Sequence, residues 1–436
     1  MRILQVCNGY PHRAYGGVEL HTFRVCGALR EKGHELAVFT RFSDLTRPDG
    51  EVEDEEVDGI RVRSVVNDFK EGRFRDHYLS RSVADEFRRT LQEFSPEVVH
   101  FQHLIGLSAD LPLVAREYGA RVVASVLDYW YVCQRVMFQP PDGTGCRGPA
   151  GKSCIDCVLQ DRAPSVAWPD RLLDLVRGLG AGVAVRGPEA NRHRFEALRS
   201  AIDTYDRIDT CARFVVDEFA RQGMPLPSDR TRVIALAVDH TGFSPAGAPA
   251  DLPVREERPL RIGFVGHTLF HKGPHLLLEA LALLPDRPVA LELWGKRHPD
   301  HPYDRRFSEL LAREPRATHH GRFEDGTLPD VLGSVDVLAV PSTCLETYGL
   351  ATREAFLAGR PVVTTDRGAL PESVRDGVDG LIVPGEDPGA FARALGRLID
   401  EPALLPALTA GAAETRGTVK TMERYTSEIE EWLYRS

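Results

Sequence analysis

The chain has 436 residues, 42% of them hydrophobic, which suffices for two or three domains with well-formed cores. Its formal net charge of −10 argues against a nucleic-acid partner held by phosphate contacts. No apolar run approaches the length of a membrane span, and the first residues predict a strand rather than a signal sequence, so we expect a cytoplasmic protein without membrane association.

The first 40 residues have the pattern of a parallel α/β crossover unit. The apolar strand MRILQVC is followed by a polar loop with Gly16 and Gly17, a helical pattern from Val18 to Leu29, and a strand from Glu35 to Thr40. Such units build doubly wound sheets. The loop lacks the GxGxxG spacing of a dinucleotide site, and by spacing alone the two glycines indicate a tight turn.

The alternation of elements continues through the first half of the chain. Residues 44–58 are acidic and polar, which predicts a solvent-exposed connecting segment. The pattern then predicts a strand at 60–63, a helix at 78–94, and strands at 96–101 and 121–126.

Two histidines, His100 and His103, lie at the carboxyl end of the strand predicted at 96–101. Ligands bind at such strand ends in open parallel sheets. A lone histidine is more often a hydrogen-bonded structural residue. His103, just before the next apolar segment, is the better candidate for a functional group.

A stretch rich in glycine and proline carries four of the eight cysteines, namely Cys133, Cys146, Cys154 and Cys157. Eight cysteines in a chain of this length do not form a disulfide framework. Four thiols have the ligand number of a structural zinc site, and the loop has too few apolar residues to order itself otherwise. Disulfides, free thiols and an iron-sulfur cluster are the alternatives. Four thiolates leave no open coordination position, so the expected role of a metal here is structural.

The segment from residue 168 to 198 mixes apolar and basic positions. It could form a membrane-surface or acceptor-binding helix. Three glycines between residues 178 and 182 weaken a continuous helix, which favours a packed or mobile helical pair. A strand at 208–211, a helix at 213–222 and a strand at 232–238 follow, and a run rich in proline and alanine predicts a linker near 243–259.

The second half again alternates strands and helices. A strand at 260–266 precedes Lys272-Gly273 and an apolar helix through Leu284. Further strands are predicted at 289–294, 335–340, 362–365 and 381–383, and further helices at 327–332, 388–399 and 422–434. Lys272 follows the carboxyl end of the strand predicted at 260–266. There it could neutralise a leaving diphosphate, or it could be an ordinary exposed lysine before a helix.

The stretch from Pro341 to Gly368, PSTCLETYGLATREAFLAGRPVVTTDRG, is the most informative in the sequence. We expect Glu346 on the loop after a buried strand and Glu354 inside a helix that begins near Gly349. Eight helical steps would separate the two carboxylates by roughly 12 Å, too far to act on one atom.

The backbone between these two carboxylates predicts an anion site. It consists of the free amides at the start of the helix, Tyr348, Gly349, Leu350 and Ala351. Carboxylate, amides and carboxylate suit a sugar joined to a nucleoside by a diphosphate, with one glutamate accepting from sugar hydroxyls and the other from ribose hydroxyls. The plainer alternative is a strand-loop-helix unit in which Glu346 caps and Glu354 is solvated.

This stretch resembles the donor motif of the retaining glycosyltransferases of family 4, which have the two-domain GT-B fold. The matching positions are Pro341, Ser342, Glu346, Gly349, Leu350, Arg353, Glu354, Ala355, Gly359, Pro361, Val362, Val363, Gly368, Glu372, Gly377 and Gly380. The loop Gly16-Gly17-Val18-Glu19 and the pair Lys272-Gly273 match as well, and the cysteines are similar to those of a cysteine-bearing branch. The resemblance spans nearly the whole chain apart from residues 134–199.

The resemblance implies two Rossmann-like doubly wound domains that face each other across a cleft. We expect an acceptor-side domain at residues 1–245, with a cysteine-rich insertion around 133–200, and a linker at 246–259. The nucleotide-sugar-binding domain would occupy 260–415, and a helix at 416–436 would pack back on the first domain.

It also implies roles for individual residues. The Gly16-Gly17 loop would face the donor diphosphate, Lys272 would bind it, and His267 stands where many members have arginine, so that one fixed charge becomes conditional on protonation. The loop before residue 324, with Arg322 and Phe323, would hold the nucleobase. The leaving phosphate would accept the proton of the attacking hydroxyl, and no catalytic cofactor is expected.

One position departs from the family pattern. The strand end that usually reads Leu-His-Asp-Tyr-Trp in the family reads Val126-Leu127-Asp128-Tyr129-Trp130 here, so a leucine replaces the histidine that contacts the donor sugar. His103 or Asp128 could take over that contact. Alternatively the sugar lacks the hydroxyl concerned, or catalysis is impaired.

We therefore expect a retaining glycosyltransferase that moves a sugar from a nucleoside-diphosphate sugar, with uridine favoured, to a hydroxyl of a small-molecule, polysaccharide or lipid-linked acceptor. The alternative is a non-catalytic nucleotide-sugar-binding or activating subunit. A phosphorylase or an epimerase on the same fold is a third hypothesis. The sequence indicates neither the acceptor nor the oligomeric state.

Overall fold

The computed structural model describes residues 1–14, 16–69, 74–139, 146, 148, 154, 157, 183–243 and 258–435. The chain divides into two compact units, and each is described by itself. Unit 1 comprises Met1–Ala235 and Met422–Ser436, and unit 2 comprises Leu236–Thr421. The division falls before the predicted linker, most of which lies outside the described residues.

Unit 1 is built on an eight-stranded sheet in the order β3-β4-β2-β1-β5-β6-β7-β8. All neighbouring strands are parallel except β3 and β4, which are antiparallel. The inner strands are apolar and buried, as in parallel sheets covered on both faces. The strands are β1 (Arg2–Val6), β2 (Glu35–Phe42), β3 (Val52–Val57), β4 (Ile60–Val66), β5 (Val98–Phe101), β6 (Arg121–Val126), β7 (Arg207–Thr210) and β8 (Thr231–Val233).

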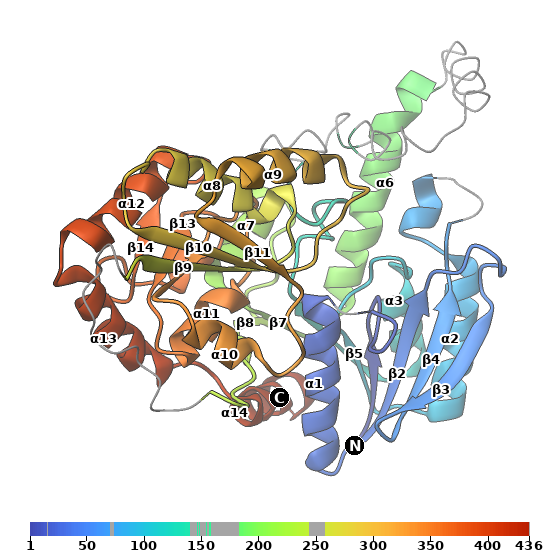
Figure 1. The fold of residues 1–436 in the computed structure, drawn as a ribbon. Coiled ribbons are helices and arrows are strands. Elements are labelled where there is room, and N and C mark those ends of the chain that lie inside the picture. Colours follow the sequence, from blue (N-terminus) through green and yellow to red (C-terminus); the bar gives the residue numbers. More distant parts are fainter. Residues whose placement is uncertain are drawn as a thin grey trace. The chain divides into compact units, whose positions relative to one another are not determined.

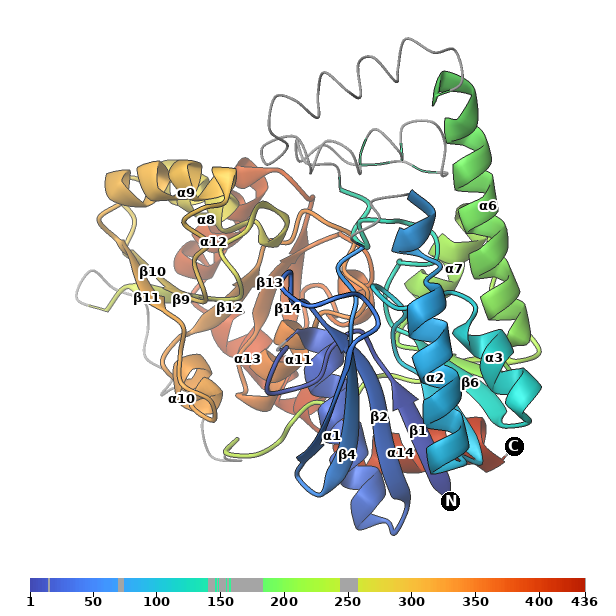
Figure 2. The same ribbon diagram turned by 90° about the vertical axis from the view of Figure 1, so that its right-hand side faces the viewer.

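Helices cover both faces of this sheet, with α2 and α3 on one face and α1 and α14 on the other (Figures 1 and 2). Side chains alternate accordingly along β5, where Phe101 packs near Phe87 of α2 and His100 contacts the C-terminal segment. The helices are α1 (Gly17–Glu31), α2 (Arg81–Phe94), α3 (Leu111–Tyr118), α6 (Val183–Thr204), α7 (Arg213–Arg221) and α14 (Met422–Ile429), which continues as a π-helical turn, Glu430–Arg435.

The C-terminal segment is bound into unit 1 by buried polar contacts. The Tyr434 hydroxyl lies 2.8 Å from Nδ1 of His100, and Trp432 Nε1 donates to the Ile208 carbonyl at 2.9 Å. The Glu430 carboxylate binds Lys32 at 2.8 Å and His34 at 3.1 Å. The final helix therefore belongs to the same compact unit as the first strand.

Unit 2 has a six-stranded, entirely parallel sheet in the order β11-β10-β9-β12-β13-β14. Its strands are β9 (Leu260–Val265), β10 (Val289–Trp294), β11 (Ala317–Gly321), β12 (Val337–Val340), β13 (Val362–Thr365) and β14 (Gly380–Val383). Its helices are α8 (Pro274–Ala282), α9 (Pro302–Arg313), α10 (Leu328–Gly333), α11 (Leu350–Leu357), α12 (Pro388–Asp400) and α13 (Leu404–Arg416).

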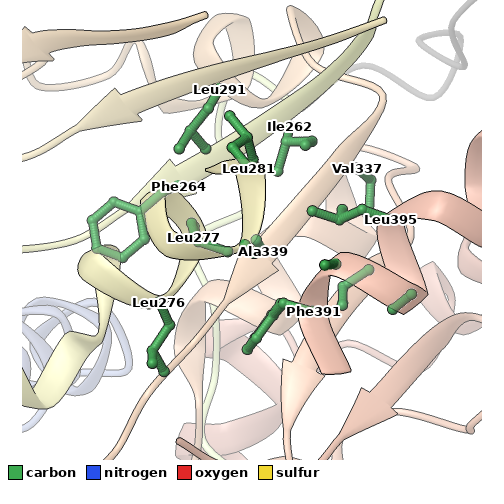
Figure 3. Packing of buried hydrophobic residues seen from close by; sticks show 14 of the residues in the cluster. Ile262, Phe264, Leu276, Leu277, Leu281, Leu291, Val337, Ala339, Phe391 and Leu395 are labelled. Atoms are coloured by element: carbon green, nitrogen blue, oxygen red, sulfur yellow. The ribbon is translucent and has the colours of Figure 1, made fainter. Parts of the chain in front are cut away.

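Two apolar clusters cover the two faces of this sheet. Along β12, Val337 and Ala339 join the cluster formed with α8, α9 and α12, whereas Leu338 and Val340 join the cluster formed with α10 and α11. This follows from the two-residue period of a strand. Figure 3 shows the first cluster, with Leu277 of α8 and Phe391 of α12 packed over the strands. The sheet is thus held between helices, and its loops are left to form a site.

The predicted fold class, two doubly wound α/β units, is confirmed, but several elements differ from the predictions. Residues 44–58 include the edge strand β3, where a solvent-exposed connecting segment was predicted. The strand predicted at 232–238 is the shorter β8, and α3, α9, β11 and α13 were not predicted. Ion pairs explain β3, because Arg63 on β4 binds Asp54 at 2.7 Å and Arg13 binds Glu55 at 3.1 Å. In the predicted helical pair, residues 168–182 lie outside the described residues, and the rest is part of α6.

Within the described ranges, no helix combines the length and the apolar character needed to cross a bilayer.

The Glu430 contacts give a prediction for stability. Burial alone would raise the pKa of Glu430, but the hydrogen bonds and charges of Lys32 and His34 outweigh it, so the pKa is lowered. A carboxyl group with a lowered folded-state pKa stabilises the fold above its unfolded value, near 4.3, and loses this contribution as the pH falls through the folded value. Glu430→Gln should therefore lower the free energy of unfolding at pH 7 by about 1–3 kcal/mol.

Urea denaturation of the full chain at pH 7 and at pH 3.5 measures this effect, and the difference from wild type should shrink at the lower pH. Glu431→Gln is the matched control, because Glu431 is the next residue and is exposed. An equal loss in both variants would show that the buried ion pairs contribute nothing specific.

Candidate active site

Two glycines allow the loops of unit 2 to meet at the carboxyl edge of the sheet. Gly273 has φ 70°, and a Cβ there would lie 1.9 Å from the carbonyl oxygen of Pro341. Gly368 has φ 65°, and a Cβ there would lie 2.1 Å from the carbonyl oxygen of Glu346. Ala369 donates its amide to the same oxygen at 2.7 Å. Both positions need glycine for conformation and for space, so the loops after β9, β12 and β13 form one packed unit.

This packing brings Lys272 and Glu346 together. Lys272 Nζ donates to Glu346 Oε1 at 2.7 Å, and Ser342 Oγ donates to the same oxygen at 2.6 Å. Within the part of the chain that the structure describes, the hydrogen bonds to this carboxylate all go to Oε1. Oε2 is therefore available to accept from a ligand hydroxyl.

The electrostatics of this pair favour the charged forms of both groups. Burial alone would raise the pKa of Glu346, but the nearby Lys272 charge and the two hydrogen bonds outweigh it, and the pKa is lowered. Burial alone would lower the pKa of Lys272, but the Glu346 carboxylate outweighs it, and the pKa is raised. The two shifts agree, and they give a carboxylate and an ammonium at neutral pH.

The start of α11 supplies backbone amides beside this pair. Gly349 precedes the helix with φ 72°, and a Cβ there would lie 2.6 Å from Leu370 Cδ2. The amides of Leu350 and Ala351 belong to the first helical turn, whose N–H groups lack intrahelical acceptors. Glu354 follows one turn later and is half-buried.

The side chain of Tyr348 turns inward rather than towards a ligand. Its hydroxyl donates to the Leu236 carbonyl at 2.8 Å, and the Arg353 guanidinium lies 3.5 Å from its ring centroid. Of the predicted ligand contacts, Tyr348 can therefore offer only its backbone amide.

The remaining predicted donor residues of unit 2 lie on loops after β9 and β11. His267 is exposed, and its Nδ1 lies 2.9 Å from Nε2 of His298. Arg322 is exposed and pairs with Asp325 at 3.1 Å, and Phe323 is half-buried. Sequence reasoning missed His298, although its position four residues after the end of β10 and beside Lys296 was a usable signal.

In unit 1 the structure brings the predicted residues His103 and Asp128 into contact. They follow the adjacent strands β5 and β6, and His103 Nε2 and Asp128 Oδ2 form an ion pair or hydrogen bond. The amide of Ile105 donates to His103 Nδ1 at 2.8 Å, so the proton of a neutral ring lies on Nε2 and points to Asp128. Trp130 donates its amide to Asp128 Oδ1 at 2.7 Å. Leu127 is buried, with 5% of its surface exposed.

Gly16 is the N-cap residue of α1 and Gly17 its first residue, and the carboxylate of Glu19 lies against Gly16. A Cβ on Gly16 would be 2.1 Å from Glu19 Oε2, and Asn8 Nδ2 donates to Glu19 Oε1 at 3.0 Å. An acidic side chain in the first turn offsets the positive end of the helix dipole. From the sequence, Glu19 was noted only as part of the matching Gly16-Gly17-Val18-Glu19 motif. No sequence pattern predicted a role for Asn8.

The four predicted zinc ligands do not form a metal site in the described residues. No group of three or more ligand-type side chains is close enough there to hold a metal ion. Cys133, Cys154 and Cys157 are half-buried and Cys146 is exposed, and burial raises the pKa of Cys133. The described sulfurs therefore do not fit a zinc centre as they stand, and most of the surrounding segment lies outside the described residues.

Unit 2 thus has, at one sheet edge, a lysine, a carboxylate with one oxygen hydrogen-bonded, the first amides of a helix and further basic side chains. Such a set suits a diphosphate that carries hydroxyl-bearing groups at its ends. Unit 1 offers a carboxylate oriented by an imidazole.

Comparisons with known proteins agree with this chemistry. Residues 15–140 match the family model described as Glycosyltransferase Family 4, and residues 259–401 match that of Glycosyl transferases group 1. A relative from Corynebacterium urealyticum, named D-inositol 3-phosphate glycosyltransferase, is 29% identical over 403 residues, which cover 88% of this chain and 83% of the relative.

Solved structures share the fold at low sequence identity. Sucrose-phosphate synthase from Thermosynechococcus elongatus has a TM-score of 0.67 at 19% identity, covering 100% of this chain and 98% of that chain. Anabaena Alr3699/HepE in complex with UDP and glucose has a TM-score of 0.65 at 15% identity, covering 99% and 98%. The two family models, the relative that spans most of the chain and the shared GT-B fold lead to one conclusion, that this protein belongs to family 4 of the glycosyltransferases and is a transferase enzyme.

Proposed function

We propose that the protein is a retaining glycosyltransferase that binds a nucleoside-diphosphate sugar through unit 2 and transfers the sugar to a hydroxyl group. The observation that carries this proposal is the Lys272–Glu346 pair beside the N-terminus of α11. A cation and free amides stabilise the charge that develops on a departing diphosphate. The cation is already fixed before the donor binds, because Lys272 donates to Glu346 and Ser342 holds that carboxylate in place.

Glu346 has a second role in this proposal. Oε1 orients Lys272, and Oε2 accepts from a hydroxyl of the donor sugar. Glu354, on α11, accepts from ribose hydroxyls, and Gly349, Leu350 and Ala351 donate their amides to the phosphates. Arg322 and Phe323 adjoin the nucleobase. The leaving phosphate takes the proton of the attacking hydroxyl, so no protein base and no catalytic metal are required.

In unit 1 we assign different roles to the two residues in contact. Both ring nitrogens of His103 are engaged, so this residue positions Asp128 rather than contacting substrate. Asp128 has lone pairs left on both oxygens and can accept from a sugar hydroxyl, which makes it the replacement for the histidine that Leu127 displaces. The Gly16-Gly17 loop contributes backbone amides, with Glu19 limiting how much negative charge it attracts.

The names of similar proteins suggest which substrates to try first. The relative from Corynebacterium urealyticum is named for D-inositol 3-phosphate, and the Anabaena structure holds UDP and glucose. Uridine diphosphate sugars are therefore our first choice of donor, and phosphorylated polyols and sugars our first choice of acceptor. Action in the cytoplasm fits such soluble substrates. A structural zinc is not part of this proposal.

The decisive experiment measures transfer from UDP-, GDP- and ADP-sugars to a panel of polyol phosphates and saccharides, with the anomeric configuration of the product read by NMR. Transfer with retention supports the proposal. Donor binding without hydrolysis or transfer to any acceptor would instead favour a non-catalytic subunit, and turnover without an acceptor alcohol would favour a phosphorylase or an epimerase.

Loss of the fixed cation gives the first kinetic prediction. Lys272→Met should lower kcat about 10²- to 10³-fold, because the departing diphosphate loses its strongest partner. Glu346→Gln should lower kcat as well, since the amide holds the lysine less firmly. Arg305→Met, which removes an exposed cation from α9 of the same unit, is the control and should leave kcat unchanged. A Lys272→Met enzyme with wild-type kcat would remove the basis of the mechanism.

The roles assigned to Asp128 and His103 can be separated in the same assay. Asp128→Asn should lower kcat/KM about 10- to 100-fold, because a hydrogen bond to a charged acceptor is lost, while the affinity for free UDP stays the same. His103→Gln should retain most activity, since its amide can donate where Nε2 did, whereas His103→Leu should not. Asp203→Asn, at an exposed position on α6, is the control. Full activity of Asp128→Asn would contradict the assignment.

A further inference from the structure

The loops after β9 and β10 pack against each other backbone to backbone. Gly266 donates its amide to the Trp294 carbonyl at 3.0 Å, and Thr268 donates to the Lys296 carbonyl at 3.1 Å. A Cβ on Gly295 would lie 1.7 Å from the carbonyl oxygen of Gly266. Because β9 and β10 are parallel neighbours, both loops lie at the same sheet edge as Lys272.

Each of these loops presents an imidazole, and the two rings are in contact. His267 Nδ1 lies 2.9 Å from His298 Nε2, and the rings stack with centroids 5.2 Å apart and an interplanar angle of 20°. A hydrogen bond between ring nitrogens needs a proton on one nitrogen and a lone pair on the other. The pair can therefore carry one positive charge without losing this bond, but not two.

Cations dominate the surroundings of His267. Loss of water around the ring, then His298, and then the charges of Lys272, Lys296 and Arg322 lower the pKa of His267. The neighbouring His271 is also affected, and burial followed by the charge of Lys272 lowers its pKa to about 4. While no ligand is bound, these surroundings therefore disfavour a charge on His267. An anion among these cations would reverse the balance and favour a protonated ring.

We propose that His267 and His298 form a proton-accepting part of the diphosphate site, so that donor binding adds a proton to the pair and the affinity for the donor falls as the pH rises. This inference rests on the proposed function and extends its phosphate site to the loop after β10. The protonated pair donates a charge-assisted hydrogen bond to a phosphate oxygen. By linkage, uptake of one proton makes the association constant fall up to tenfold per pH unit between the pKa of the free pair and that of the bound pair.

The test measures binding of UDP-, GDP- and ADP-glucose to the full chain between pH 5.5 and 8.5 by calorimetry. These probes suit the purpose because both ends of their diphosphate are esterified, so they lack the phosphate proton that titrates near pH 6 in a free nucleoside diphosphate. Runs in buffers of different ionisation enthalpy count the protons taken up. We expect the affinity of the best-bound probe to fall with rising pH and up to one proton to be taken up.

The variants are chosen to keep the geometry and remove the titration. Asparagine places an amide where His267 has Nδ1, and glutamine places one where His298 has Nε2. The double variant His267→Asn, His298→Gln should bind with an affinity that varies little with pH and that matches wild type at pH 8.5. His267→Arg should bind tightly at every pH because its charge is fixed. His320→Gln is the control, since His320 pairs with Glu292 at 2.6 Å, and it should keep the wild-type pH dependence.

The outcomes separate this inference from the proposed function. Donor binding that does not change with pH in the wild-type protein, or a pH dependence that persists in the double variant, would overturn the inference alone. Failure of every donor to bind at any pH would overturn the proposed function and this inference with it.

Discussion

The ion pair between Lys272 and Glu346 is the interaction on which the proposed donor site of unit 2 depends. It exists because two backbone contacts, at Gly273 and Gly368, bring three loops within hydrogen-bonding distance of each other. A buried ion pair is weak evidence for stability, since desolvation offsets much of the attraction. Here the ion pair serves to hold the lysine in position. The lysine is fixed at the sheet edge before any phosphate arrives, so little reorganisation is needed when charge develops on a leaving group.

The positively charged groups at this sheet edge are of two kinds, those charged at any pH near neutrality and those charged only when protonated. Lys272 and the amides of α11 are available at any pH near neutrality, whereas the imidazoles of His267 and His298 contribute charge only when protonated. In unit 1 the opposite arrangement is found at α1, where Glu19 already offsets the helix dipole.

The sequence allowed the fold class and most inner elements to be predicted, because buried strands such as β6 and β12 are largely apolar runs. The edge strand β3 could not be predicted, since VEDEEV has no apolar face and is stabilised by arginines from other elements. Lys272 and Glu346 were predicted from a motif, but their contact depends on glycines that allow close backbone approach, which no local pattern reveals. The His267–His298 contact likewise arises from packing between loops far apart in sequence.

The contact between His103 and Asp128 supports the roles that we propose for these two neighbours of Leu127. Leu127 is buried, and the strand end carries a leucine before Asp128 where the family pattern has a histidine. The tautomer of His103, fixed by the Ile105 amide, directs its proton to Asp128, whose half-buried carboxylate keeps lone pairs for a ligand hydroxyl. A carboxylate accepts from hydroxyls as an imidazole can, and it also carries negative charge. Glycosyl transfer develops positive charge at the reacting carbon, so such a group would stabilise the transition state more than the ground state. The departure from the family pattern is therefore compatible with an active enzyme whose sugar contact has moved by one residue.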